Sequence, residues 1–171
     1  MKIGIGVKLG IGAGIINCIA WYAFARHFGF YSLDIYNYRF LTTLLLLLVG
    51  VFISIFLQRK AFSGFIDFKI ALKTGVVYSI TIGAFLAAFN FIYHKFIIPD
   101  AIDFFISEER NAWLDHNKSL EEVNKYLVEY YIPTFGSFHV LMTTIIWGIL
   151  ISLLAGAILS KKKPAMPFSE N

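Results

Sequence analysis

The residues best suited to chemistry in this chain are its four histidines, His27, His94, His116 and His139. Three of them, His27, His94 and His139, stand near the ends of long apolar stretches, and a chain that folds back could bring them together. With a carboxylate from Asp100 or Asp103, their imidazoles would suit a zinc ion or a pH-responsive cluster. No fixed ligand spacing joins them, so solvated histidines at helix ends are the favoured alternative and the metal site is a hypothesis.

Other catalytic chemistry finds little support in the sequence. The chain lacks the His-Glu-x-x-His, Gly-x-Ser-x-Gly and phosphate-binding Gly-Lys-Ser or Gly-Lys-Thr patterns. Its single cysteine, Cys18, allows neither an intrachain disulfide nor a thiolate metal cluster. Carboxylates between residues 100 and 109 could serve acid–base catalysis, but an acidic loop is usually only solvated. We therefore expect a non-enzymatic protein without a cofactor.

The composition around these residues is that of a membrane protein. Of the 171 residues, 58% are hydrophobic and only 15% are charged, whereas charged residues make up about a quarter of a soluble domain. A bilayer core of about 30 Å needs roughly 20 helical residues. Uncharged runs predict four spans at approximately residues 5–27, 38–58, 68–96 and 134–160. We expect one membrane domain over residues 1–171, an all-α four-transmembrane-helix bundle embedded in the lipid bilayer.

Basic residues flank the predicted spans on one side. Two lysines precede the first uncharged run, four basic residues lie between the second and third runs, and three lysines follow the fourth: Lys2, Lys8; Arg59, Lys60, Lys69, Lys73; Lys161, Lys162, Lys163. The positive-inside rule predicts that these regions are cytoplasmic, with both termini inside. Because the charges are divided among the flanks, we do not expect nucleic acid as a partner.

A cleaved signal peptide is the alternative for the first span. Residues Ala23 to Ala25 resemble a small-x-small cleavage site that follows a basic start and an apolar run. The bulky side chains of Trp21, Tyr22 and Phe24 argue against cleavage, so we expect the span to be retained.

The connection between the third and fourth spans, residues 97–132, is too long to be structureless. It reads as an outward-facing helical loop of two short amphipathic helices, the first from about Asp100 to Leu114. Ser119 and Glu122 form a capping box at the start of the second helix. Pro99 predicts the end of the third span.

Small residues recur every four positions in each predicted span. They are Gly6, Gly10 and Gly14; Gly50 and Ser54; Gly75, Ser79, Gly83 and Ala87; and Gly148, Ser152 and Gly156. This spacing places each set on one narrow stripe of its helix, where two backbones can approach closely in lipid. We therefore predict tight packing of the bundle through these residues. Asn17, Asn90, Thr81 and Ser152 are expected to form hydrogen bonds between helices, and a substrate or water path is the alternative use of these polar groups.

Three functions remain open at this point. The first is a non-enzymatic accessory or structural protein whose small-residue faces and outer loop bind another membrane protein or a second copy. The second is a small oligomeric transporter or channel, although the centre of the spans lacks the ionisable residues typical of coupled carriers. The third is a metal or pH sensor that uses the outward histidines.

Three segments carry a family resemblance: Phe65 to Gly75, Ile92 to Asp100, and Gly148 to Ser152. With these segments the chain resembles, over nearly its whole length, a family of small four-span bacterial membrane proteins catalogued as a domain of unknown function, number forty-one ninety-nine. The resemblance implies a multi-pass protein of the bacterial inner membrane. It implies no activity, substrate or catalytic residue.

Overall fold

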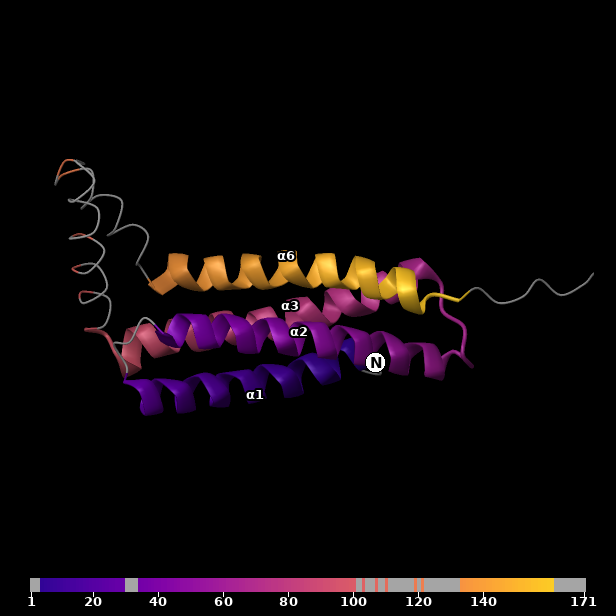
Figure 1. Cartoon of the computed structure of the whole chain (residues 1–171), viewed down its shortest axis with the longest axis horizontal. Helices are drawn as coiled ribbons and strands as arrows, with labels where there is room; N and C mark the ends of the chain where they lie inside the picture. Colours follow the sequence, from indigo (N-terminus) through magenta and orange to yellow (C-terminus); the bar gives the residue numbers. More distant parts are fainter. Residues whose placement is uncertain are drawn as a thin grey trace, which may run out of the picture.

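Four long helices make up the described part of the protein (Figure 1). The computed structural model describes residues 4–29, 34–100 and 133–161, together with positions 103, 107, 110, 119 and 121. The helices are α1 (Ile5–Phe28), α2 (Asp34–Ala61), α3 (Phe68–Ile92) and α6 (Pro133–Leu159), and the short π-helix η1 (Tyr93–Ile97) extends α3. All four are long and apolar enough to cross a membrane. The predicted all-α, four-helix membrane fold is confirmed, and the protein is a multi-pass integral membrane protein.

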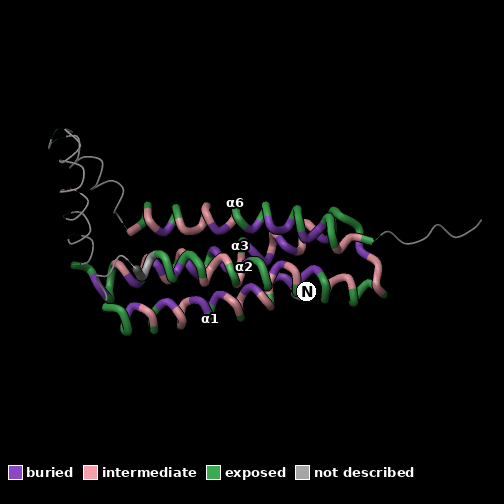
Figure 2. The backbone as a smooth tube through the Cα atoms, viewed as in Figure 1, coloured by how far each residue is buried: buried purple, intermediate pink, exposed green. Residues whose placement is uncertain are grey.

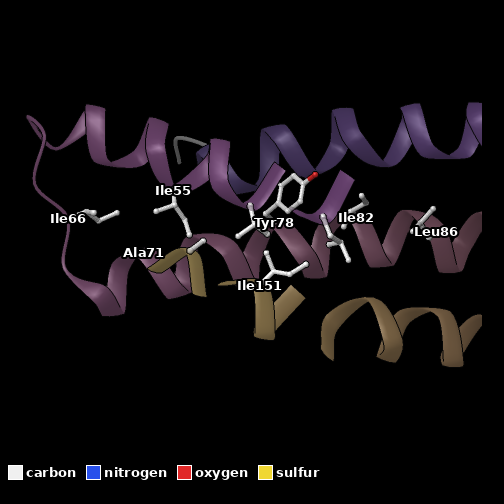
Figure 3. Close-up of a cluster of buried hydrophobic side chains, with 10 residues drawn as sticks. Ile55, Ile66, Ala71, Tyr78, Ile82, Leu86 and Ile151 are labelled. Carbon is white, nitrogen blue, oxygen red and sulfur yellow. The ribbon is translucent and has the colours of Figure 1, made fainter. Parts of the chain in front are cut away.

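Helix α3 lies at the centre of the bundle and packs against each of the other three helices. In Figure 1, α6 and α1 run along opposite edges, with α2 and α3 between them. The main core cluster follows α3, where Ala71, Tyr78, Ile82 and Leu86 are buried (Figure 3). Ile55 from α2 and Ile151 from α6 face this row. Close side-chain packing along this central helix holds the flanking helices in place, since burial from lipid gives no hydrophobic gain.

The outside of the bundle is apolar. Exposed isoleucine, leucine and phenylalanine side chains cover the outer faces of α1, α2 and α6, and Figure 2 shows exposed positions turning away from the helix contacts. Lipid chains are as apolar as these side chains, so their exposure is stable in a bilayer and not in water.

One end of the bundle brings together the turn between α2 and α3 and the end of α6. The Arg59 Nε donates to the Gly64 carbonyl at 2.8 Å, and its Nη1 donates to the Leu159 carbonyl at 3.4 Å. Ile66 and Lys161 exchange two backbone hydrogen bonds in an isolated antiparallel bridge. Ser63 and Gly64 have positive φ angles of 57° and 89°, which gives the turn its sharp reversal. Hydrogen bonds therefore join the end of α2, the α2–α3 turn and the end of α6 to one another.

At the opposite end, η1 ends at Ile97 and the chain leaves the helix before Pro99, as the sequence predicts. At the other end of α3, beside the α2–α3 turn, Asp67 lies at the N-cap, but its side chain makes no capping hydrogen bond. The two helices predicted within residues 97–132 fall outside the described residues, apart from the few single positions given above.

Candidate functional site

The glycine stripe of α1 faces α3. Gly6, Gly10 and Gly14 are buried, and a methyl group added at any of them would lie 2.7 Å from an atom of α3. The atoms met are the Thr74 carbonyl oxygen, Thr81 Cβ and Phe85 Cβ, respectively. Real carbon contacts are about 3.5–4.0 Å. Glycine at these three positions is therefore what allows α1 to lie directly against α3.

Helices α3 and α6 mesh through the stripes that the sequence marks on each. A methyl group at Gly75 would overlap the Ser152 side chain, and one at Gly148 would overlap the Ser79 side chain. Gly83 faces Thr144 less closely, since a methyl group there would lie 3.4 Å from Thr144 Cβ and 3.2 Å from Leu141 Cδ1. Each step of four residues forward along α3 thus matches a step of four backward along α6. The two helices form an antiparallel interface in one fixed register.

The remaining predicted packing residues lie in different surroundings. A side chain at Gly50 would overlap the hydroxyl of Tyr78, which reaches across to donate to the Leu46 carbonyl at 2.8 Å. Ser54 is fully buried. Gly156 faces the Phe68 ring, and Ala87 is half-buried. Gly50 therefore makes room for a large side chain instead of a small one.

A buried polar cluster joins the helices near the end that carries η1. Arg39 of α2 is only 8% exposed, although it lies within the apolar helix that could span the membrane. Its Nη1 donates to Asn90 Oδ1 at 2.9 Å, and Asn90 Nδ2 donates to Ser137 Oγ at 3.1 Å. Ser137 in turn donates to the Pro133 carbonyl. One chain of hydrogen bonds thereby connects α2, α3 and α6.

Trp21 brings α1 into the same cluster. The guanidinium carbon of Arg39 lies 3.8 Å from the centroid of the Trp21 ring, a cation–π contact. Phe89 and Tyr93 pack against the same ring, with centroids 5.0 and 4.7 Å away. Trp21 and Tyr93 are each 2% exposed. The cluster therefore holds a positive charge away from lipid and water by means of an aromatic face and an amide oxygen.

Sequence reasoning missed Arg39. The residue directly precedes the uncharged run that begins at Phe40 and is the second residue of the predicted span 38–58, a position typical of an arginine at the membrane surface. Helix α2 begins at Asp34 instead, which places Arg39 more than one turn inside the helix. The signal available in the sequence was an arginine at the same end of its span as Trp21 and Asn90, two side chains able to bind a guanidinium.

The polar residues predicted to bond between helices divide into two kinds. Asn17 Nδ2 donates to Thr43 Oγ1 at 2.9 Å, which joins α1 to α2, and Asn90 bonds between helices as described. Thr81 and Ser152 instead donate to carbonyl oxygens one turn back in their own helices. The prediction is wrong for these two hydroxyls, because a helix offers its own carbonyl as the nearer acceptor.

The three histidines of the metal hypothesis lie in three separate surroundings. His27 is exposed and packs edge-on against Phe28. His94 is half-buried beside Trp21 and Tyr93. His139 is exposed on α6, with its Nε2 3.4 Å from Thr143 Oγ1. Among the described residues, no group of three or more histidine, cysteine, aspartate or glutamate side chains could hold a metal ion.

Comparison with known proteins adds one finding to this geometry. A family model described as "Protein of unknown function (DUF4199)" matches residues 8–161. No curated protein and no solved structure matches the chain.

Proposed function

Since the chain belongs to the DUF4199 family of proteins of unknown function, we propose a function from its geometry: it is a non-enzymatic accessory or structural protein of the membrane that binds another membrane protein or a second copy. It acts without a cofactor or a resident metal ion. One observation carries this proposal, namely the use that the chain makes of its buried polar groups.

Eight polar or charged residues are buried in the described part of the protein: Asn17, Arg39, Ser54, Ser79, Asn90, Ser137, Thr144 and Ser152. Each of them donates a hydrogen bond within the chain. A substrate path would instead need polar groups directed into an open passage. Asn17, Arg39 and Asn90 donate to residues of other helices and join them, whereas the five hydroxyls donate to carbonyls of their own helices. The donors of these eight residues are thus used inside the bundle, which is typical of a protein whose task is to present a stable surface.

The surface offered to a partner differs from the one expected from sequence. The small-residue stripes of α1, α3 and α6 face other helices of the same chain. Contact with a partner then falls to the apolar outer faces, for example around Ile16 and Ile19 on α1 or Leu150 and Leu154 on α6.

Photocrosslinking in the native membrane tests this proposal. A photoreactive amino acid replaces Ile19 on one outer face or Leu154 on the opposite one, and each serves as the control for the other. We expect one of the two faces to give a single discrete protein adduct, identified by native mass spectrometry of the extracted complex. Lipid adducts alone from both faces, together with a monomeric mass, would refute an accessory role.

A small oligomeric transporter or channel is the second candidate, and Arg39 is the observation that favours it. Ionisable residues inside membrane spans are rare and often mark ion or substrate pathways. Flux of small anions into liposomes that contain the protein tests this candidate. The transporter function requires an anion flux that the Arg39→Gln variant abolishes while the protein remains folded.

For its placement, we propose a bacterial inner membrane with both termini in the cytoplasm. The basic residues at the end that carries the α2–α3 turn support this orientation through the positive-inside rule. Single cysteines in a Cys18→Ser background test it. A membrane-impermeant thiol reagent should label Glu121→Cys from outside intact cells and leave Lys60→Cys unlabelled; the reverse pattern inverts the orientation.

A further inference from the structure

The end of the bundle that carries the α2–α3 turn presents an exposed set of lysines. Lys60 lies in the last turn of α2, Lys69 and Lys73 lie in the first two turns of α3, and Lys161 follows α6; all four are exposed. We call these four residues the basic end. Asp67 is the acidic residue that the structure describes beside them. The fold therefore gathers a net positive charge from three separate parts of the chain.

One of these lysines, Lys69, lies where a helix disfavours a cation. The N-terminus of a helix carries partial positive charge, so acidic residues are favoured there and basic ones are not. The first turn of α3 contains Lys69 and no acidic residue, Asp67 stands at its N-cap, and Lys73 follows in the second turn, where the effect has faded. The two lysines lie one turn apart, which places both on one face of the helix. Lys69 gains nothing from the helix end, and the two exposed ammonium groups on one face can bind the same anion from outside the chain.

The backbone beneath the basic end is fixed by contacts already described. Arg59 binds the Gly64 and Leu159 carbonyls, and the Ile66–Lys161 bridge joins the turn to the end of α6. Lys161 Nζ lies 5.7 Å from the centroid of the Phe65 ring. The backbone that bears the lysines is therefore held in place by hydrogen bonds. Binding an anion there does not require the turn to be ordered first.

Exposed aromatic rings lie among the lysines. Phe62 is 49% exposed and Phe68 is 40% exposed, both within a few residues of the charged side chains. A ring beside an ammonium group suits a molecule with an anionic head and an apolar tail, since the lysine binds the phosphate and the ring contacts the acyl chain. A free phosphate ion has no apolar part that could contact the rings.

We propose that the basic end is a binding surface for the headgroups of anionic phospholipids. The lysines bind the phosphates, and Phe62 and Phe68 contact the glycerol and upper acyl region. This surface is independent of any partner on the outer faces of α1 or α6.

Thermal unfolding of the full chain in a mild neutral detergent tests the proposal. Phosphatidylglycerol, phosphatidylcholine or inorganic phosphate is added in separate titrations, and an apparent Kd is taken from each shift in Tm. We expect phosphatidylglycerol to raise the Tm at concentrations where the other two do not. A lysine near an anionic surface contributes about a fivefold change in affinity, so Lys69→Gln/Lys73→Gln should weaken phosphatidylglycerol binding roughly 25-fold.

Lys95→Gln is the matched control, because Lys95 is an exposed lysine at the opposite end of α3 and η1. It should retain the affinity of the unaltered chain, and Lys69→Arg/Lys73→Arg should retain most of it. The Tm of every variant without lipid shows whether the fold is intact. Equal shifts with the two lipids, an equal loss in the Lys95 control, or an equal effect of inorganic phosphate would each overturn the proposal.

Discussion

Replacing Gly10 by alanine, with Gly12→Ala as its control, gives the sharpest test of how α1 is held. Both glycines are helical residues of α1, and both changes add one methyl group. At Gly10 that methyl would lie 2.7 Å from Thr81 Cβ and 3.0 Å from the Tyr78 carbonyl oxygen. At Gly12 it would meet no atom within 4 Å. The two variants thus differ in what the methyl group touches and in little else.

The expected energies follow from these distances. Thr81 Cβ and a backbone carbonyl cannot move away by a change of rotamer, so the contact at Gly10 is relieved only if α1 shifts outward by about 1 Å. Overpacking of this kind costs about 1–3 kcal/mol. At Gly12 the methyl group clashes with nothing, and the better helix propensity of alanine contributes up to about 1 kcal/mol of stability. Gly10→Ala gains the same helix propensity, which cancels in the comparison, so the two variants should differ by the overpacking cost of about 1–3 kcal/mol.

The assay is reversible unfolding of the full chain in mixed micelles by increasing fractions of a denaturing detergent, followed by circular dichroism. Free energies of unfolding for both variants and the unaltered chain are obtained under one set of conditions. If Gly10→Ala and Gly12→Ala change stability equally, the close packing of α1 on α3 is refuted, whatever the size of the change.

The same unfolding assay checks the remaining structural predictions. Arg39→Lys should lose about 2–4 kcal/mol, because an ammonium group cannot both stack on Trp21 and reach the amide that the guanidinium binds; full stability would contradict the cluster. Tyr78→Phe should cost only about 0.6 kcal/mol, since it removes one hydrogen bond within lipid. Gly50→Ala should cost more than Tyr78→Phe, and the penalty should fall when Tyr78 is also replaced by alanine; strict additivity would show that the two residues do not touch. Protein purified without chelator should hold less than one zinc ion per chain by metal analysis, and His94→Ala should leave that content unchanged.

The sequence was sufficient to predict the helices and the faces on which they pack. A spacing of four among small residues marks one stripe on a helix, and the stripes of α3 and α6 do meet. The spacing cannot say which stripe meets which, nor in what register. At Gly50 the spacing suggests close approach of another helix backbone, but the neighbour is the ring of Tyr78. A small residue on a helix surface does not reveal the size of the group that packs against it.

The polar cluster was harder to predict, for a reason that lies in the position of helix ends. An arginine beside an apolar run reads as a flank if the helix begins with the run, and as a buried charge if the helix begins earlier. Helix α2 starts five residues before Arg39. Asn90 was recognised as a polar residue able to bond between helices, but its partners come from α2 and α6, far away in sequence.

The central position of α3 has a consequence for the synthesis of the protein. A chain is made from its N-terminus, so α1 and α2 leave the ribosome before α3 exists. The Asn17–Thr43 hydrogen bond joins these two helices. The surface depressions left by the glycines are all occupied by residues of α3, however: Gly6, Gly10, Gly14 and Gly50. Until α3 enters the membrane, the hairpin of α1 and α2 exposes these unfilled depressions along its inner face. A polypeptide cut short after α2 would remain in that state, and its unfilled surface would distinguish it from the finished protein for the chaperones and proteases of the membrane.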